Sequence, residues 1–303
     1  MNNDLTEKIN CETNRIVFFA HFDKQNIIHD YVIYYLQRLR ETAKSIVFVS
    51  TSDLQEAEIA KIKDLCFKII TRANTGYDFM SWKIALTSVD ISKYDELIIC
   101  NDSVYGPLFS LDEVFTAMKG RDCDFWGITG SHQWGYHIQS YFVSFKRPVF
   151  MSPVFRDFFE GVTDRKSKLD IINKYEVGLS QKLLKNGFKS ETYVHYVPSV
   201  WKKIKYLTLS GFIKYLKWLF PTPKKELFAK ISLNLTHYFW REIITRDRMP
   251  FVKIELLRDN PKKVNIANYD LFIKKHSDYD LTLITRHLNR DINIETSRPE
   301  IRQ

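Results

Sequence analysis

The residues best placed to do chemistry gather at Asp102, within the tripeptide Asn101-Asp102-Ser103. This tripeptide follows residues 96–100, a short apolar run that predicts a buried strand. Open α/β sheets bind ligands beyond the carboxyl ends of their strands, and a carboxylate there can hold a metal ion against a diphosphate. The alternative is a turn that only caps the next segment. Mg²⁺ or Mn²⁺ is therefore a candidate cofactor with Asp102 as its ligand, although the tripeptide offers only one carboxylate.

A second polar group precedes that strand and is a candidate for binding a nucleotide diphosphate. Its members flank Gly76, which lets a backbone approach a ligand closely, and they are Arg72, Asn74, Asp78 and Lys83. A guanidinium or ammonium group can face phosphate oxygens, and the Asp78 carboxylate can accept hydrogen bonds from a nucleobase or a sugar hydroxyl. The alternative is an ordinary loop and helix, with Asp78 in the first turn because acidic residues there interact favourably with the helix dipole.

Two further residues are candidates for catalysis or metal binding. Glu176 interrupts an otherwise apolar helical pattern over residues 167–186, so it could point into a cleft and act as the general base for a sugar hydroxyl. Its alternative place is the solvated face of that helix. His195 lies in a predicted strand, residues 190–197. It is a weaker candidate as a metal ligand, because a single strand histidine is more often structural.

The segment from Trp126 to Tyr141 combines aromatic and polar side chains with three glycines. Aromatic faces stack on the C–H surfaces of sugars, while amide and hydroxyl groups bind sugar hydroxyls. We therefore predict an acceptor-binding surface formed by Trp126, His137, Gln139 and Ser140. Packing of the aromatic rings in the core is the alternative.

These residues need a sheet to position them, and the first third of the chain predicts one. Apolar runs alternate with helical patterns there, which is typical of a parallel sheet covered by helices. The predicted strands are 15–20, 45–50, 66–71, 96–100, 123–129, 138–145 and 190–197, and the principal helices 27–39, 54–65, 78–88 and 111–119. The chain is thus predicted to be α/β, with a Rossmann-type, mostly parallel sheet flanked by helices.

Composition narrows the class and the compartment. The chain is 45% hydrophobic and 27% charged, which is ordinary for a globular protein. Its four cysteines are widely spaced without a CxxC motif, as expected for reduced thiols in the cytosol. The first residues lack the apolar core of a signal peptide, and no run of about 18 apolar residues is present. We therefore expect a cytoplasmic location.

Positive charge gathers in the C-terminal third. Residues 202–263 hold 15 lysines and arginines against 5 aspartates and glutamates, in a chain of net charge +9. We predict a tail of residues 1–14, a catalytic domain of residues 15–200 and a basic helical extension of residues 201–303. Residues 202–225 surround an amphipathic pattern that could bind an anionic membrane surface or pack on the catalytic domain. No nucleic-acid-binding motif accompanies this charge, so nucleic acid is not an expected partner.

Six ordered strings resemble the rhamnan synthesis protein F family, which are bacterial glycosyltransferases of cell-wall, capsule and O-antigen polysaccharide assembly. The resemblance spans residues 15–261. The strings are NTGYDFMSWKIAL (74–86), YDELIICNDSVYGPLF (94–109), DFWGIT (124–129), HIQSYFVSFKR (137–147), YEVGLSQKLLKNGF (175–188) and PFVKIELLRDNP (250–261). This resemblance implies a GT-A-like fold. By position it implies that Glu176 is the catalytic base, that Asp102 takes the metal or diphosphate role, and that the donor is bound by Arg72, Asn74, Gly76, Asp78, Lys83, Asn101 and Ser103.

The resemblance also implies a reaction and a location. The donor would be a nucleotide-activated deoxysugar, dTDP-L-rhamnose, and the acceptor a lipid-linked saccharide at the inner face of the cytoplasmic membrane. Transfer would invert the sugar, with Glu176 taking the acceptor proton while the diphosphate leaves toward Asp102. The pair of carboxylates usual in GT-A glycosyltransferases is reduced here to Asp102, so Arg72 or Lys83 could supply part of the positive charge. The alternative function is a non-catalytic saccharide- or lipid-binding assembly factor on a degenerate transferase fold.

Overall fold

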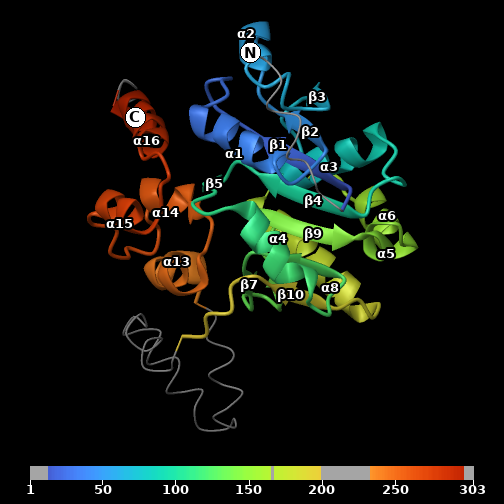
Figure 1. The fold of residues 1–303 in the computed structure, drawn as a ribbon. Coiled ribbons are helices and arrows are strands. Elements are labelled where there is room, and N and C mark those ends of the chain that lie inside the picture. Colours follow the sequence, from blue (N-terminus) through green and yellow to red (C-terminus); the bar gives the residue numbers. More distant parts are fainter. Residues whose placement is uncertain (1–12, 165–166, 199–232, 297–303) are drawn as a thin grey trace, which may run out of the picture.

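A seven-stranded mixed sheet runs through the centre of the protein (Figure 1). The computed structural model describes residues 13–164, 167–198 and 233–296. The strands lie in the order β10-β6-β9-β4-β1-β2-β3. Their bounds are β1 Arg15–His21, β2 Ser45–Ser50, β3 Lys68–Thr71, β4 Glu96–Asn101, β6 Phe125–Gly127, β9 Phe142–Lys146 and β10 Ser190–Thr192.

Strand β1 forms the middle of the parallel part of the sheet, between β2 and β4. Every residue of β1 is buried, and its alternating side chains supply both faces of the sheet. Val17 and Phe19 belong to one hydrophobic cluster, and Ile16 and Phe18 to the other. Strands covered on both faces are apolar throughout rather than alternating, which is why the runs were visible in the sequence. The predicted α/β class with a mostly parallel sheet is confirmed.

The later strands depart from the predicted boundaries. β9 lies antiparallel between β4 and β6, a direction that an apolar run does not reveal. The predicted strand 138–145 divides into β9 and a short β8, His137–Ile138, which pairs with β7, Gly130–Ser131, in a separate ribbon. Strand β10 is also shorter than predicted and ends at Thr192, although the N–H groups of Tyr193 and Val194 still donate to the carbonyls of Gly127 and Ile128.

Helices cover both faces of the sheet. The cluster containing Val17 is packed by α1, Asp30–Arg40, and α4, Leu111–Lys119. The cluster containing Ile16 is packed by α3 Tyr77–Ser88, α6 Pro153–Glu160 and α8 Gly178–Lys185. The shorter elements are α2 Glu56–Ala60, α5 Arg147–Phe150, α7 Lys168–Ile171 and the π-helix η1 Ile172–Val177. The predicted helix 54–65 is therefore realised as one short helix followed by turns.

The described C-terminal residues pack into the same core as the sheet. Their elements are α12 Leu235–Tyr238, α13 Trp240–Asp247, β11 Val252–Lys253, α14 Ile254–Arg258, α15 Tyr269–His276 and α16 Thr282–Thr296. Figure 1 shows the helices from α13 to α16 grouped on one side of the molecule, beyond β5. Phe251 packs its ring 5.1 Å from that of Tyr35 on α1. β11 pairs antiparallel with β5, Val104–Tyr105, which follows β4 directly.

The segment predicted to bind a membrane, residues 202–225, lies outside the described residues, and so does most of the predicted N-terminal tail. Within the described ranges, no helix is both long and apolar enough to cross a bilayer.

Candidate active-site cleft

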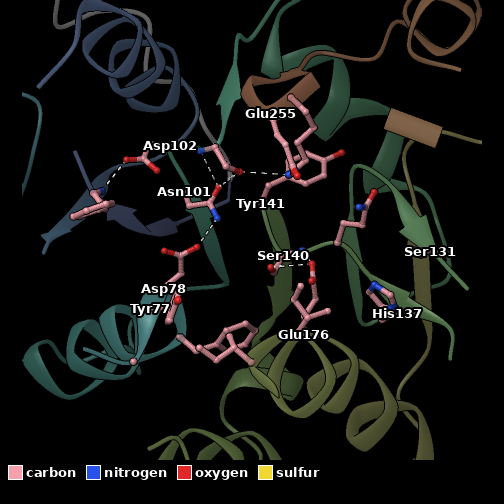
Figure 2. Close-up of a pocket in the computed structure, with 18 of the residues that line it drawn as sticks. Tyr77, Asp78, Asn101, Asp102, Ser131, His137, Ser140, Tyr141, Glu176 and Glu255 are labelled. Atoms are coloured by element: carbon pink, nitrogen blue, oxygen red, sulfur yellow. Dashed lines mark hydrogen bonds between the residues drawn. The ribbon is translucent and has the colours of Figure 1, made fainter. Parts of the chain in front are cut away.

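A cleft of about 910 Å³ opens beyond the carboxyl ends of β1, β2 and β4 (Figure 2). Its strand-end wall is drawn from residues 74–79 and 101–103, and its loop wall from residues 131–141 and 171–176. Side chains between positions 234 and 255 complete the lining from the C-terminal part. This is the edge at which open α/β sheets bind ligands, and the volume suits a small-molecule substrate.

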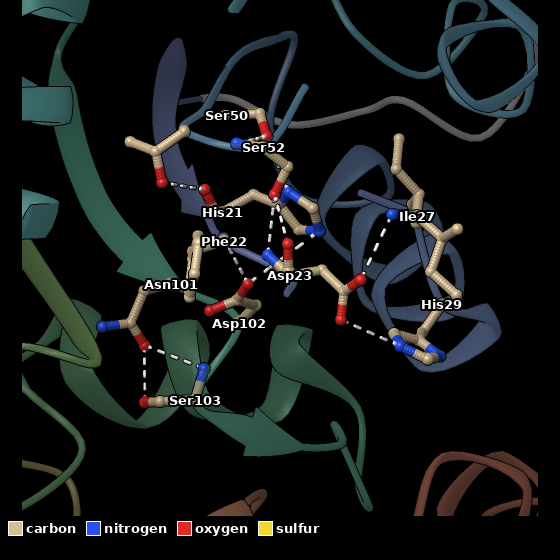
Figure 3. Close-up of polar contacts among 12 residues, drawn as sticks. His21, Phe22, Asp23, Ile27, His29, Ser50, Ser52, Asn101, Asp102 and Ser103 are labelled. Atoms are coloured by element: carbon tan, nitrogen blue, oxygen red, sulfur yellow. Dashed lines mark hydrogen bonds and ion pairs between the residues drawn. The ribbon is translucent and has the colours of Figure 1, made fainter. Parts of the chain in front are cut away.

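Asp102 joins the ends of two neighbouring strands (Figure 3). Its Oδ2 accepts a 2.8 Å hydrogen bond from the backbone N–H of Phe22, just after β1. The hydroxyl of Tyr31 donates to the Asp102 carbonyl at 3.1 Å, and Nε2 of His21 lies 4.0 Å from the same Oδ2. The carboxyl side chain is 16% exposed. Burial raises the pKa of Asp102 well above its usual range, nearby carboxylates add to the rise, and the Phe22 N–H opposes it.

Asn101 links the tripeptide to α3. Its Nδ2 donates to Oδ2 of Asp78 at 2.7 Å, and its Oδ1 accepts from the backbone N–H and hydroxyl of Ser103 at 3.2 and 2.6 Å. Burial raises the pKa of Asp78, while the Asn101 hydrogen bond and the charges of Lys253 and Arg72 oppose that rise. Three of the residues predicted to bind the sugar donor therefore form one hydrogen-bonded network on the strand-end wall.

The side chains of the described residues do not form a complete metal site by themselves. No group of three or more His, Cys, Asp or Glu side chains gathers in the described ranges in a way that could hold an ion. In the tripeptide, the side-chain oxygen of Asn101 accepts a hydrogen bond from Ser103, and one carboxylate oxygen of Asp102 accepts one from Phe22. Mg²⁺ is usually bound through one or two carboxylates together with substrate phosphates and water, and Asp102 is the single carboxylate that the tripeptide offers. We therefore assign no step to a metal ion.

The two cations predicted to face a diphosphate, Arg72 and Lys83, do not line the cleft. Lys83 donates from Nζ to the carbonyls of Glu160, at the end of α6, and Val162, at 2.8 and 2.9 Å. Arg72 stands behind the strand-end wall and holds its loop. Its guanidinium donates to the carbonyls of Ala73, Thr75 and Tyr77 and to the hydroxyl of Ser81. Both side chains thus have structural positions, because backbone carbonyls engage their charged groups.

The loop held by Arg72 has an unusual backbone. Gly76 has a φ of 67°, in the left-handed region, and a Cβ there would stand 2.8 Å from Cβ of Met80. Only glycine adopts this conformation without strain. The next residue, Tyr77, also has a positive φ of 52°, and its side chain is 47% exposed at the cleft. Asn74 lines the cleft beside them.

Glu176 belongs to the loop wall, opposite the tripeptide (Figure 2). It lies on η1, a π-helical turn between α7 and α8, and such turns often occur at functional sites. Its Oε1 accepts hydrogen bonds from the backbone N–H of Ser140 at 2.6 Å and from the Ser140 hydroxyl at 3.0 Å. Both contacts fall on one carboxylate oxygen, so they orient the group while Oε2 takes part in neither.

Two other predicted acceptor residues line the cleft beside Ser140. His137 is buried, with Nδ1 2.9 Å from the carbonyl oxygen of Gly135. Gln139 accepts a 2.7 Å hydrogen bond on Oε1 from the hydroxyl of Thr129. The structure therefore brings to one wall three of the four residues that were predicted to bind the acceptor saccharide.

The positions of Trp126 and His195 contradict the roles predicted for them. Trp126 is 1% exposed, and its ring packs against Phe115 and Phe142 in the core, so it cannot touch an acceptor. It lies on β6 and faces α4, which the pattern of the surrounding loops did not reveal. His195 is exposed, contacts the guanidinium of Arg121 through Nε2, and does not line the cleft. That contact would repel a metal ion from the same nitrogen.

Sequence reasoning missed the C-terminal contribution to the cleft. Lys253 places Nζ 3.4 Å from Oγ of Ser103 and 3.9 Å from the ring centroid of Tyr141. His237 lines the same side, and burial lowers its pKa to about 4, so its imidazole is neutral at physiological pH. The available signal for Lys253 was a lysine inside the apolar run 249–257.

Trp134, on the loop wall, belongs to the aromatic segment that was predicted to bind the acceptor. It is 51% exposed and has a φ of 60°. A bulky residue in the left-handed region is strained, and such strain concentrates at functional sites. Trp134 thus exposes an aromatic ring on the loop wall, while Phe22 and Tyr77 expose rings at the strand-end side of the cleft.

A model of the family described as "Rhamnan synthesis protein F" matches residues 46–215. The chain is also 30% identical over 231 residues to the virulence protein VirA of Vibrio anguillarum, covering 71% of this chain and 69% of that protein. It is 23% identical over 159 residues to the uncharacterized protein y4gN of Sinorhizobium fredii, covering 50% of this chain and 42% of that protein.

Among solved structures, the glycosyltransferase GlyE of Streptococcus pneumoniae is 10% identical, with a TM-score of 0.46 over 96% of this chain and 66% of that chain. The 4-diphosphocytidyl-2C-methyl-D-erythritol synthase of Anaerococcus prevotii is also 10% identical, with a TM-score of 0.38 over 60% of this chain and 87% of that chain. At these scores we base the function on the family and on the geometry of the cleft.

Proposed function

Because the chain belongs to the rhamnan synthesis protein F family, we propose that it transfers a sugar from a nucleotide donor to a growing saccharide. The donor we propose is dTDP-L-rhamnose, and the acceptor is a lipid-linked saccharide of bacterial surface polysaccharide synthesis. One observation supports this proposal most directly. The tripeptide at the end of β4 and the carboxylate of Glu176 line one cleft from opposite walls, as two substrates meeting at a reaction centre require.

The strand-end wall is assigned to the nucleotide donor. Gly76 brings backbone to the surface of the cleft, and Asn74, Asp78 and Asn101 offer side chains that hydrogen-bond sugar and base. The exposed ring of Tyr77 is suited to stacking on a nucleobase or a sugar. Asp102 remains the residue assigned to the diphosphate side. Burial raises the pKa of its carboxyl group above the usual range, which lessens the repulsion between that group and a diphosphate.

The loop wall is assigned to the acceptor. Ser140 orients Glu176 through Oε1, so we assign Oε2 to the acceptor hydroxyl. The oxygen of the acceptor hydroxyl attacks the anomeric carbon, and Glu176 takes the proton of that hydroxyl. The bond between the anomeric carbon and the diphosphate breaks, and its electron pair leaves on the diphosphate. Attack and departure on opposite sides invert the configuration. Trp134 supplies an exposed ring for stacking on acceptor sugars.

The location follows from the acceptor. A lipid-linked saccharide is made at the cytoplasmic face of the membrane, so we propose that the enzyme works there as a peripheral protein. Residues 202–225, which carry seven lysines, are assigned to the anionic lipid surface, at about 1 kcal/mol for each cation near the surface.

The test has a binding arm and a transfer arm. We expect titration calorimetry over a panel of nucleotide sugars to select one donor, and radiolabelled transfer to a saccharide acceptor to follow with that donor. Asp102→Ala should abolish transfer while circular dichroism shows an intact fold. A protein that binds the lipid-linked saccharide but no nucleotide sugar would contradict a transferase and favour the second candidate, an assembly factor, which the single carboxylate of the tripeptide also favours.

A further inference from the structure

Lys253 reaches the end of β4 through strand pairing rather than through sequence proximity. β11 lies antiparallel to β5, with Lys253 opposite Val104, the residue after the tripeptide. Its Nζ is therefore 3.4 Å from the hydroxyl of Ser103. The same ammonium group stands over the ring of Tyr141, 3.9 Å from the centroid, which is a favourable position for a cation.

The segment that carries Lys253 is fixed on the tripeptide loop by backbone contacts. The N–H of Ile254 donates to the carbonyl of Ser103 at 3.1 Å, and the N–H of Leu108 donates to the carbonyl of Pro250 at 2.7 Å. A Cβ on Gly106 would stand only 2.4 Å from that Pro250 oxygen. The ammonium group is thus held by a rigid segment, and preorganised charge of this kind is what electrostatic catalysis uses.

The charged side chains that line the cleft show why the position of the Lys253 ammonium group matters. Five carboxylate side chains line it, those of Asp78, Asp102, Asp164, Glu176 and Glu255. Among the described residues, Lys253 is the single lysine or arginine in the lining. Carboxylates repel a diphosphate unless a cation lies between them, and the described side chains do not assemble a metal site.

We propose that Lys253 binds the diphosphate of the donor and supplies the positive charge that a divalent cation would otherwise provide. The proposal rests on the proposed function, because it assigns a role within the same cleft. As the bond to the anomeric carbon breaks, its electron pair moves onto the terminal phosphate oxygen, and the ammonium group stabilises the new charge. An ammonium group acts here as a point charge. Transfer therefore proceeds without a divalent metal.

Pyrophosphate binding in EDTA tests this role apart from sugar transfer. We expect wild-type protein to bind inorganic pyrophosphate by titration calorimetry in EDTA. Lys253→Gln, which keeps a hydrogen-bond donor toward Ser103, should bind it about 10- to 100-fold more weakly, the range expected for a lost charged hydrogen bond. Lys253→Arg should retain most of the affinity. Lys274→Gln, an exposed lysine on α15, is the matched control and should behave as wild type.

The transfer assay extends the test. With a donor in hand, wild-type turnover should be unchanged by EDTA, and Lys253→Gln should lower kcat by about 10²- to 10³-fold. Equal pyrophosphate affinity in wild type and Lys253→Gln would overturn the proposal, and so would wild-type binding or turnover that disappears in EDTA and returns with Mn²⁺. A wild type that binds pyrophosphate through Lys253 but transfers no sugar would overturn the proposed function and leave the role of Lys253 standing. If Lys253→Gln does not fold, Lys253→Arg and Lys253→Met carry the comparison.

Discussion

The two walls of the cleft are constructed in different ways. The strand-end wall comes from one continuous stretch, in which a loop, a helix and a strand succeed one another between residues 72 and 103. The loop wall is assembled from the ribbon at 130–138, the residues just before β9 and the π-helix that carries Glu176. The comparison teaches that binding groups on the first wall follow from local structure. The position of the proposed base on the second wall, Glu176, depends on contacts between segments, such as its hydrogen bond with Ser140.

The carboxyl groups of the two walls also differ in their surroundings. Asp102 and Asp78 are held inside the strand-end wall, where burial raises the pKa of each. Glu176 is oriented by two hydrogen bonds on Oε1 at the surface of the loop wall. Under the proposed function, the strand-end wall would bind the anionic donor and the loop wall would take up the proton.

The sharpest test of this division is Glu176→Gln. If the loop wall holds the base, kcat should fall about 10²- to 10⁴-fold, the usual contribution of general acid–base catalysis, while donor affinity measured by calorimetry stays the same. Glu160→Gln, an exposed glutamate on α6, is the matched control and should retain activity. A comparable loss of donor binding in Glu176→Gln would show that the walls do not work separately.

The stability of the protein in acid tests the packing of His21 at the end of β1, beside the strand-end wall. Burial lowers the pKa of His21 to about 4. The contribution of neutral His21 to the free energy of unfolding is therefore fully present above the unfolded pKa near 6.5, and it is lost as pH falls through 4. At about 1.4 kcal/mol per pKa unit, the loss is on the order of 3 kcal/mol. His21→Asn should show a smaller decline of unfolding free energy between pH 6.5 and 4 in urea titrations. An equal decline in both proteins would assign the acid sensitivity elsewhere.

Arg72→Ala tests whether the strand-end wall depends on its support. Losing the guanidinium leaves three loop carbonyls and the hydroxyl of Ser81 without these donors, so we expect about 1–3 kcal/mol of destabilisation and weaker donor binding. Arg72→Lys should not restore the loop, because an ammonium group lacks the planar fork. Arg156→Ala, at an exposed position on α6, is the control. Unchanged stability in Arg72→Ala would contradict the supporting role.

The smallest expected effect belongs to Ser140→Ala. This change removes one hydrogen bond to Glu176 and keeps the stronger one from the backbone N–H. We expect kcat to fall by up to about tenfold, less than the full effect of losing a hydrogen bond to a charged group, because the backbone N–H still holds Oε1. Donor affinity should not change. Steady-state kinetics would measure it, and a loss as large as that of Glu176→Gln would indicate that Ser140 itself contacts the acceptor.

Sequence reasoning was most successful where structure is local. Residues 15–101 give the order of four strands and the helices between them, because strands buried on both faces are apolar throughout. It failed for Trp126 and for the cations Arg72 and Lys83. Residue type and spacing indicate what a side chain can bind, and packing decides whether it faces the cleft, the core or a neighbouring carbonyl.

The sequence alone determined the α/β class, the family resemblance and the carboxylate at the end of β4. These features depend on hydrophobic periodicity and on short motifs that lie within a few tens of residues. Only the tertiary structure decided which charged groups share the cleft. Lys253 meets Ser103 across 150 residues, because the described C-terminal residues bury Phe239, Phe251 and Leu256 in the same core as the sheet. Such a contact is selected by the packing of distant apolar surfaces, which no pattern along the chain specifies.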